Sequence, residues 1–576
     1  MKPVLILGAG INGAAVARDL TINGIPVCIV DVGDVAGGAT SRSSRLIHGG
    51  LRYLEYRDTD LVRESLHERE RLLRLAPHFV KPLRLTIPVS RRLGGLWAGF
   101  IRFSGLARTP LGSFLLKFGR GPRGLIAIKA GLAMYDRLAR SDSLPPHSIE
   151  RSNDVKFGTD FRHRSRWLCS YSDAQLEFPE RFVLAMLEDS RRAARENNCS
   201  FEVFPWHKVT IAEHSHEVTI TPSGRDDSEE HASHKTISPS IIVNATGAWG
   251  DRTLKALGLR EKTLFAGTKG SHLFTSHQPL IDALNGNGVY AEANDGRLVF
   301  ILPCAGGVLI GTTDEPFADS PDNAVASSAE VDYLLQMVTD VFPDITLTTD
   351  DVCMHHAGVR PLPKGSNSSA AAIPRGHSIE ETSIGKIPIL TLVGGKLTTC
   401  RSLAEEVCNR ICLLQNQKRH RSTDDRPSPG ASSCQQTQPA ENELTKLAEQ
   451  SGLTSAQAAT MWTLVGNRFN EVFSDRLHNK GSTEHENADN DSIFGTTIPR
   501  QFVRWSIQNE WCTKLEDLVE RRLMLIFHST IHRATLVELA RELAESGRLE
   551  SSQIDDEIER ASQRLQKFYG KSVTPD

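Results

Sequence analysis

Short apolar runs alternate with longer mixed stretches at the start of the chain. Residues 4–7 (VLIL) are apolar, a glycine-containing stretch follows, and residues 27–30 (VCIV) are apolar again. Apolar runs of this length, bounded by turns, are typical of strands buried on both faces of a sheet. The pattern predicts two strands joined by a helix at the N-terminus.

Comparable patterns recur further along the chain. A longer mixed stretch predicts a helix over 178–194, and residues 387–407 predict a strand, a glycine pair and a helix that begins near Thr398. Short apolar runs predict additional strands over 201–203, 209–211, 241–244, 271–275, 298–301 and 308–310.

The apolar pattern weakens between residues 415 and 443, where Gln, Ser, Pro and Arg dominate. Such a composition is typical of a flexible linker or a long insertion, so we place the main domain boundary there. Apolar residues return at helical spacing over 444–473, 516–528 and 534–543, with a second polar insertion at 479–491. We therefore expect a C-terminal helical domain over about 444–560.

Length, charge and cysteine content limit the class of protein. A chain of 576 residues is too long for one hydrophobic core, so two or three domains are expected. The net charge of -3 and the absence of basic runs interleaved with aromatics argue against nucleic-acid binding. The ten cysteines form no CxxC pair, which predicts reduced thiols and no metal site. Because no leader precedes the first strand, we expect a cytoplasmic protein.

Positive charge is concentrated in one segment. Between Arg71 and Tyr135 there are twelve Lys and Arg residues and no Asp or Glu. Within it, residues 91–126 mix these cations with Trp, Phe, Leu and Gly, a composition typical of an element that lies on an anionic membrane surface. A solvated basic loop, or a cationic wall around an anionic substrate, is the alternative. No run reaches the ~18 to 20 apolar residues of a spanning helix.

The N-terminal strand and helix enclose a dinucleotide fingerprint. Gly8, Gly10 and Gly13 have the spacing GxGxxG, and Asp31 ends the second strand near the ~20-residue offset expected for a ribose partner. The glycines permit a tight turn and a close approach of backbone to a pyrophosphate, while the helix N-terminus attracts its charge. A dinucleotide site is therefore predicted.

Residues 41–56 (SRSSRLIHGGLRYLEY) place His48, Arg52 and Tyr53 around a glycine pair just downstream of the fingerprint. Imidazole accepts a proton near neutral pH, and guanidinium binds anions through paired hydrogen bonds. Lys396 is expected at the start of the helix near Thr398, where backbone N–H groups also favour an anion. The combination indicates a reactive site for an anionic substrate.

Six motifs occur in a characteristic order: GAGING, SRSSRLIHGGLRYLE, TKGSH, GTTD, AGVRPL and GGKLTT. This order resembles that of the FAD-dependent, quinone-linked (aerobic) glycerol-3-phosphate dehydrogenases and the related glycerophosphate oxidases, within the wider DAO-type flavoproteins. The resemblance spans roughly residues 3–407. A weaker one continues through VRWSIQNEWCTKLEDLVERR into the helical domain.

The resemblance implies an α/β (α+β) fold. A Rossmann-like FAD-binding domain would be interleaved with a mixed-sheet substrate domain and followed by a C-terminal α-helical domain. The oxidoreductase region would cover 1–410, with FAD-binding parts at about 1–80, 178–250 and 352–410 and a substrate part at about 255–350.

The resemblance also implies the chemistry. The cofactor would be non-covalent FAD, and sn-glycerol 3-phosphate would be oxidised to dihydroxyacetone phosphate. A membrane quinone would accept the electrons, so the protein is expected on the cytoplasmic face of the membrane as a peripheral protein, and a homodimer is compatible with this arrangement.

Flavin oxidation of a secondary alcohol needs a base for the hydroxyl proton and cations for the phosphate. His48 and His272 are both candidate bases, and Arg360 alternatively stabilises a developing alkoxide. The candidate phosphate and substrate ligands are Arg52, Tyr53, Arg375, Lys396 and Thr313, with strand capping as the alternative role for Thr313.

The candidate FAD ligands follow the same motifs. They are Gly8, Gly10 and Gly13 at the pyrophosphate, Asp31 at the ribose, Ser41 and Ser44 near the diphosphate, and Gly247, Gly395, Leu397 and Thr398 along the flavin. Cys400 stands where the family commonly has tyrosine. An oxygen-using oxidase, an amine or amino-acid oxidase, and a flavin-binding protein without turnover remain the alternatives.

Overall fold

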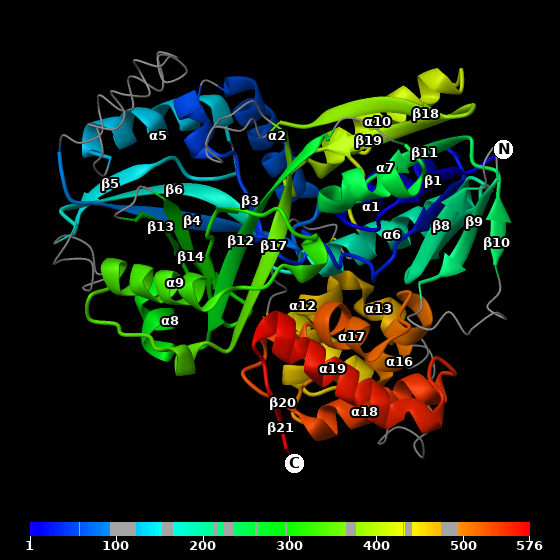
Figure 1. Ribbon diagram of the computed structural model, residues 1–576. Helices are drawn as coiled ribbons and strands as arrows, with labels where there is room; N and C mark the ends of the chain where they lie inside the picture. The colour runs from blue at the N-terminus through cyan, green and yellow to red at the C-terminus, as the bar shows by residue number, and fades with distance from the viewer. Residues whose placement is uncertain are drawn as a thin grey trace.

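The computed structural model describes most of the chain as three packed parts (Figure 1). Two of these parts are built on sheets and the third on helices. The described residues are 1–56, 58–92, 123–141, 143–152, 165–211, 217–223, 234–259, 263–293, 297–364, 376–429, 431, 441–473 and 492–575. Residues 93–122, most of the predicted membrane-associating segment, lie outside this set.

The first sheet has six strands in the order β18-β19-β11-β1-β2-β7. All neighbours pair in parallel except β18 and β19, which form a hairpin. The strands are β1 (Val4–Leu7), β2 (Val27–Val30), β7 (Phe201–Phe204), β11 (Ile241–Asn244), β18 (Ser378–Ile384) and β19 (Ile387–Val393).

Helices cover one face of this sheet and a small antiparallel sheet contributes to the other. The helices are α1 (Ile11–Ile22), α6 (Pro179–Glu196) and α10 (Cys400–Leu414), which share a core with the strands. On the other side, β8 (His207–Ile211), β9 (Val218–Pro222), β10 (Lys235–Ile237) and α7 (Gly250–Ala256) complete a second core. The strands are apolar on both faces because both faces are covered.

The second sheet, a large mixed one, has ten strands. Its strands are β3 (Leu46–Ile47), β4 (Val80–Val89), β5 (Ser148–Arg151), β6 (Trp167–Leu176), β12 (Phe265–Thr275), β13 (Gly288–Glu292), β14 (Leu298–Cys304), β15 (Gly307–Gly311), β16 (Glu315–Pro316) and β17 (Met354–Pro363). Two helices, α8 (Gln278–Leu284) and α9 (Ser328–Val341), share one core with this sheet. Two others, α2 (Thr59–Leu75) and α5 (Leu125–Ala139), share another.

The third part is the helical domain, which has a single apolar core. Its helices are α11 (Glu441–Ser451), α12 (Ser455–Val465), α13 (Phe469–Val472), α16 (Arg500–Asn509), α17 (Leu515–Asp517), α18 (Arg533–Glu545) and α19 (Ile554–Tyr569). The region predicted to be helical over 516–528 is helical but interrupted: α17 continues into a widened helical turn at Leu518–Arg522, and Met524, with a positive φ of 56°, separates this turn from a short helical turn at Leu525–Phe527.

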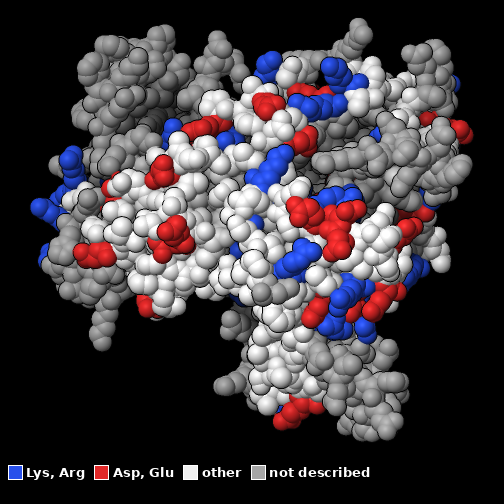
Figure 2. Space-filling model, turned by 60° about the horizontal axis from the view of Figure 1, so that its bottom comes forward, with Lys and Arg blue, Asp and Glu red and all other residues white. Residues whose placement is uncertain are grey.

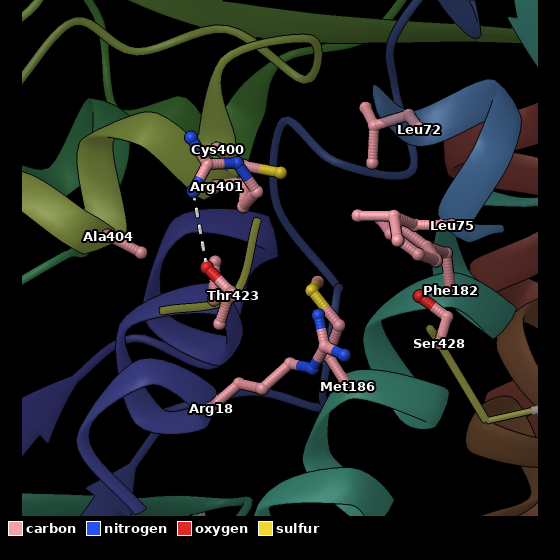
Figure 3. Close-up of a pocket in the computed structure, with 11 residues that line it drawn as sticks. Arg18, Leu72, Leu75, Phe182, Met186, Cys400, Arg401, Ala404, Thr423 and Ser428 are labelled. Atoms are coloured by element: carbon pink, nitrogen blue, oxygen red, sulfur yellow. Dashed lines mark hydrogen bonds between the residues drawn. The ribbon is translucent and has the colours of Figure 1, made fainter. Parts of the chain in front are cut away.

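The start of the predicted linker is packed against the first sheet's helices. Arg419 pairs with Asp19 of α1 at 2.9 Å, and Arg426 pairs with Asp189 of α6 at 2.7 Å. Thr423 is buried beside α10 and accepts a hydrogen bond from Arg401, at the edge of a cavity of about 20 Å³ (Figure 3). This volume suits about one water molecule. Ion pairs with residues far away in the sequence therefore hold this segment in place. The polar composition of the segment alone had predicted a flexible linker or an insertion.

Two features of the described residues bear on membrane association: the hydropathy of the helices and the distribution of charge on the surface. No described helix is long and apolar enough to cross a membrane. Acidic and basic side chains are interspersed over the face seen in Figure 2. The described cysteines are free thiols, and the described residues contain no cluster of potential metal ligands.

Candidate active site

The turn between β1 and α1 is built for close backbone approach. Gly8 has a φ of 101°, and a Cβ there would lie 2.7 Å from the Ala245 carbonyl oxygen. A Cβ on Gly13 would lie 2.0 Å from the Gly8 carbonyl oxygen, so α1 can pack against β1 only with glycine at this position. The N-terminus of α1 is thereby directed at the end of the sheet, where it favours a phosphate.

Asp31 ties this turn to the loop after β2. Its carboxylate accepts hydrogen bonds from the backbone N–H groups of Ala9 (2.7 Å) and Gly33 (2.9 Å). Burial raises the pKa of Asp31, although both donors favour its ionised form. Thr40, which the sequence analysis did not select, accepts a hydrogen bond from Ile11 N–H at 3.1 Å beside Gly10.

The ends of two strands bring the remaining cofactor candidates to this turn. Gly247 follows β11, and Gly395 follows β19, in the sheet where both strands run parallel to β1. A Cβ on Gly395 would lie 2.7 Å from the Asn12 side-chain amide of α1. Leu397 is partly buried and packs against the α1–α6–α10 core. Together with the approach of Gly8 to Ala245, these contacts place the GAGING motif, residues 245–249 (ATGAW) and the GGKLTT motif around one edge of the sheet.

The segment 41–56 leaves this edge through β3 and reaches His48. The His48 backbone N–H donates to the Thr398 hydroxyl at 3.2 Å, and the imidazole is half-buried. Its ring centroid lies 6.5 Å from those of Tyr53 and Phe300. His48 is thus held between the GGKLTT motif around Thr398 and the large mixed sheet.

A buried triad fixes the backbone that follows His48. The Tyr135 hydroxyl donates to Asp173 at 2.6 Å and accepts the Gly49 N–H at 3.0 Å, while Arg69 pairs with Asp173 at 2.8 Å. Burial and the charge of Asp173 raise the pKa of Tyr135 well above its ordinary value. Sequence analysis missed these three residues because they lie on three elements far apart in the chain.

The predicted phosphate ligands adjoin His48. Lys396 Nζ lies 4.0 Å from the centre of the Tyr53 ring and 3.3 Å from the Ser65 hydroxyl. Arg52 precedes Tyr53 in the same short helical turn, Leu51–Tyr56. Lys396 therefore lies beside Tyr53, whose ring centroid is 6.5 Å from that of His48. Arg375 lies outside the described residues.

His272 differs from His48 in its surroundings. It is buried on β12, where its Nε2 lies 2.9 Å from the Ser44 hydroxyl and its ring stacks on His356 at 5.0 Å. Burial, with the nearby charges of Arg360 and Arg45, lowers the pKa of His272 to about 3. His272 is therefore neutral at pH 7 but a weak base. The other predicted serine, Ser41, donates to the Gly38 carbonyl at 3.1 Å.

Arg360 is held at the β12–β17 edge by acidic and hydroxyl groups. Its guanidinium pairs with Asp314 at 2.8 Å and donates to the Thr312 hydroxyl at 3.0 Å. Thr313 points elsewhere: its buried hydroxyl donates to Glu330 of α9 at 2.7 Å and accepts Ser271 N–H. This arrangement favours the strand-capping alternative for Thr313.

These features define a flavin-binding oxidoreductase with a second sheet beside its cofactor site. The glycine turn, the N-terminus of α1 and Asp31 together fit the pyrophosphate and ribose of FAD. Comparison with known families agrees: residues 3–399 match the FAD dependent oxidoreductase family. The chain belongs to this family, FAD is its cofactor, and the predicted fold class is confirmed.

Within this family, the chain is similar to several dehydrogenases of phosphorylated polyols. The chain is 33% identical over 420 residues to a glycerol-3-phosphate dehydrogenase of Synechocystis sp., covering 71% of this chain and 69% of that protein. It is 28% identical to a D-erythritol 1-phosphate dehydrogenase of Brucella abortus, covering 93% and 97%. The fold matches that of a glycerol-3-phosphate dehydrogenase from Bacillus halodurans, solved with FAD, with a TM-score of 0.69 over 99% of this chain and 95% of that one, at 19% identity.

Proposed function

We propose that this protein oxidises sn-glycerol 3-phosphate to dihydroxyacetone phosphate and passes the electrons to a membrane quinone. The observation that carries the proposal is the position of His48, between the Thr398 motif at the flavin site and the Tyr53–Lys396 pair. The dehydrogenase relatives support the substrate, and the basic segment 91–126 supports a membrane location.

Each residue has a chemical role in this proposal. Lys396 and Arg52 bind the phosphate, and the Tyr53 ring restrains the ammonium group of Lys396. Arg360, oriented by Asp314, stabilises negative charge that develops on the C2 oxygen. Bound FAD supplies the acceptor for the hydride from C2. Because these fixed cations hold the substrate through its phosphate, an alcohol without a phosphate should not be positioned for reaction.

We assign the base to His48. It accepts the hydroxyl proton of the substrate because its imidazole is half-exposed, whereas His272 is buried and engaged by Ser44. We assign His272 a positioning role: it holds Ser44 in the segment that leads to His48. Both imidazoles are candidates in the sequence, and their different burial favours His48.

A longer polyol phosphate is the second candidate substrate. The D-erythritol 1-phosphate dehydrogenase matches nearly the whole length of both chains, including the helical domain, whereas the Synechocystis relative matches 71% of this chain. Both substrates offer a secondary alcohol and a phosphate to the same cations.

Anaerobic flavin bleaching tests the proposal. Glycerol 3-phosphate should reduce the bound FAD completely without oxygen, and glycerol at the same concentration should not. Faster bleaching by erythritol 1-phosphate would select the second candidate. Bleaching by an amine or amino acid alone would contradict both. Rapid reoxidation by a soluble quinone, with slow peroxide formation in air, is expected; the reverse would indicate an oxidase.

A further inference from the structure

The loop that carries Asp31 is held by the helical domain as well as by its own sheet. Asp34, three residues beyond Asp31, is buried and forms ion pairs with both Arg521 and Arg522. These arginines lie in the widened turn after α17, in the domain below the six-stranded sheet in Figure 1. Burial alone would raise the pKa of Asp34, but the charges of Arg522 and Arg521 outweigh it and lower the pKa.

A second contact reaches the same loop from its other side. Trp206, in the turn between β7 and β8, donates its backbone N–H to the Gly33 carbonyl at 2.9 Å. Its indole N–H lies 3.2 Å from the Asp517 carboxylate of α17, and Lys514 Nζ lies 3.6 Å from the centre of its ring. Trp206 has a φ of 59°, which bulky residues rarely adopt.

The helical domain also touches the segment that leads to His48. The Arg42 guanidinium lies 4.3 Å from the centre of the Tyr569 ring, and that of Arg45 lies 4.7 Å from the centre of the Phe527 ring. Arg45 also forms a buried ion pair with Glu180 at 2.7 Å. The helical domain therefore contacts both loops next to the cofactor site, residues 31–38 and 41–48.

We propose that the helical domain is a structural part of the FAD site, in which Arg521 and Arg522 clamp the Asp31 loop and so strengthen the hold on the adenosine end of FAD. Arg521, Arg522 and Asp34 act as positioning residues, since Asp31 itself would meet the ribose. The proposal rests on FAD binding alone and is independent of the substrate proposed above.

FAD retention by the holoenzyme tests the clamp without any substrate. Dilution of the holoenzyme releases FAD, and the recovered flavin fluorescence gives its dissociation constant. Asp34→Asn and Arg522→Gln should each raise this constant about tenfold or more, and the double variant should raise it no further than the stronger single change, because each change breaks the same contact. An unchanged constant in Arg522→Gln, or fully multiplicative effects, would overturn the proposal.

The matched control breaks another buried ion pair between the same two domains. Arg181 of α6 pairs with Glu510 at 2.7 Å, and its contact to the clamp is one 3.3 Å bond to the Arg522 carbonyl. Arg181→Gln should lower the melting temperature with and without excess FAD equally and leave FAD retention within about twofold. If it releases FAD as readily as Arg522→Gln, general loosening explains the effect and the clamp is refuted.

A milder variant covers the case in which Arg522→Gln fails to fold. Trp206→Phe keeps an aromatic ring at this position but replaces the indole with a smaller phenyl ring that has no N–H donor, while Asp517 retains backbone N–H donors from Thr513 and Lys514. FAD retention should weaken about two- to threefold. Unchanged retention in both Trp206→Phe and Asp34→Asn would overturn the proposal.

Discussion

The turn after β1 and the segment 41–56 lie at the same sheet edge but owe their shapes to different parts of the chain. Within the turn, a Cβ on Gly13 would meet the Gly8 carbonyl, and Asp31 binds the Ala9 amide. The other segment is held by Tyr135, by His272 and by aromatic rings of the helical domain. The contacts that shape the glycine turn are mostly between nearby residues, although the helical domain also supports the Asp31 loop, whereas the segment 41–56 depends on distant elements throughout.

The largest effect is expected at the glycine turn. Gly13→Ala would place a Cβ against the Gly8 carbonyl, so we expect a loss of more than about 3 kcal/mol in the free energy of unfolding. Purified protein should contain almost no FAD, as measured by absorbance. Gly131→Ala in α5 is the control, because no atom lies within 4 Å of its Cβ and it should stabilise the helix by about 0.5–1 kcal/mol. Normal FAD content in Gly13→Ala would show that the turn tolerates a side chain.

Removing the cation next to Tyr53 should affect substrate binding more than folding. Lys396→Met removes a charge-assisted hydrogen bond worth about 1.5–3 kcal/mol, so KM for glycerol 3-phosphate should rise about 10- to 100-fold. Steady-state kinetics with normal FAD content would measure this. Lys386→Met, on the exposed turn between β18 and β19, is the matched control and should leave KM unchanged. An unchanged KM in Lys396→Met would remove Lys396 from the phosphate site.

The distant support of the catalytic segment predicts a smaller effect. Tyr135→Phe removes the hydroxyl that joins Gly49 to Asp173, so the free energy of unfolding should fall by about 1–2 kcal/mol. Turnover should fall several-fold, and FAD should be retained. Tyr171→Phe is the control, since its ring packs edge-to-face with Tyr135 at 5.7 Å. Urea unfolding and turnover measure both variants. Equal effects in the two would mean that burial, not the Gly49 contact, is responsible.

The smallest effect concerns a buried histidine outside both regions. Burial lowers the pKa of His78 to about 3, so the folded protein keeps it neutral while the unfolded chain takes up a proton below about pH 6.5. The stability contribution is present above about pH 6.5 and is lost as the pH falls. Between about pH 7 and 5.5 this amounts to about 1 kcal/mol. His78→Phe should lose less stability than wild type over that interval in urea unfolding; identical losses would show that His78 titrates normally.

Local regularities explain what the sequence predicted. The six-stranded sheet, its glycine turn and the position of Asp31 follow from adjacent residues and from apolar runs covered on both faces. The α/β fold class followed from the same signals and from the ordered motifs. Lys396 and His48 were predicted as one site, and contacts through Tyr53 and Thr398 link them.

Long-range partners explain what it did not predict. The Arg69–Asp173–Tyr135 triad joins three elements, and no local spacing connects these residues. The ion pairs of Arg521 and Arg522 with Asp34, which lies nearly 500 positions away, likewise have no signal in the local sequence. The hydrogen bond from Thr313 to Glu330 also had no local signal, because only the fold shows that Glu330 faces Thr313.

The rate of flavin reduction tests the assignment of His48 most directly. Rapid mixing of holoenzyme with glycerol 3-phosphate, without oxygen, separates the limiting reduction rate from substrate binding. His48→Gln should lower the limiting rate by about 100-fold or more, with little change in the substrate dissociation constant, because a positioned base contributes about 10²- to 10⁴-fold. A wild-type reduction rate in His48→Gln, together with loss of flavin reduction in His272→Gln, would contradict this assignment. The buried His272 would then be the base that accepts the substrate's hydroxyl proton.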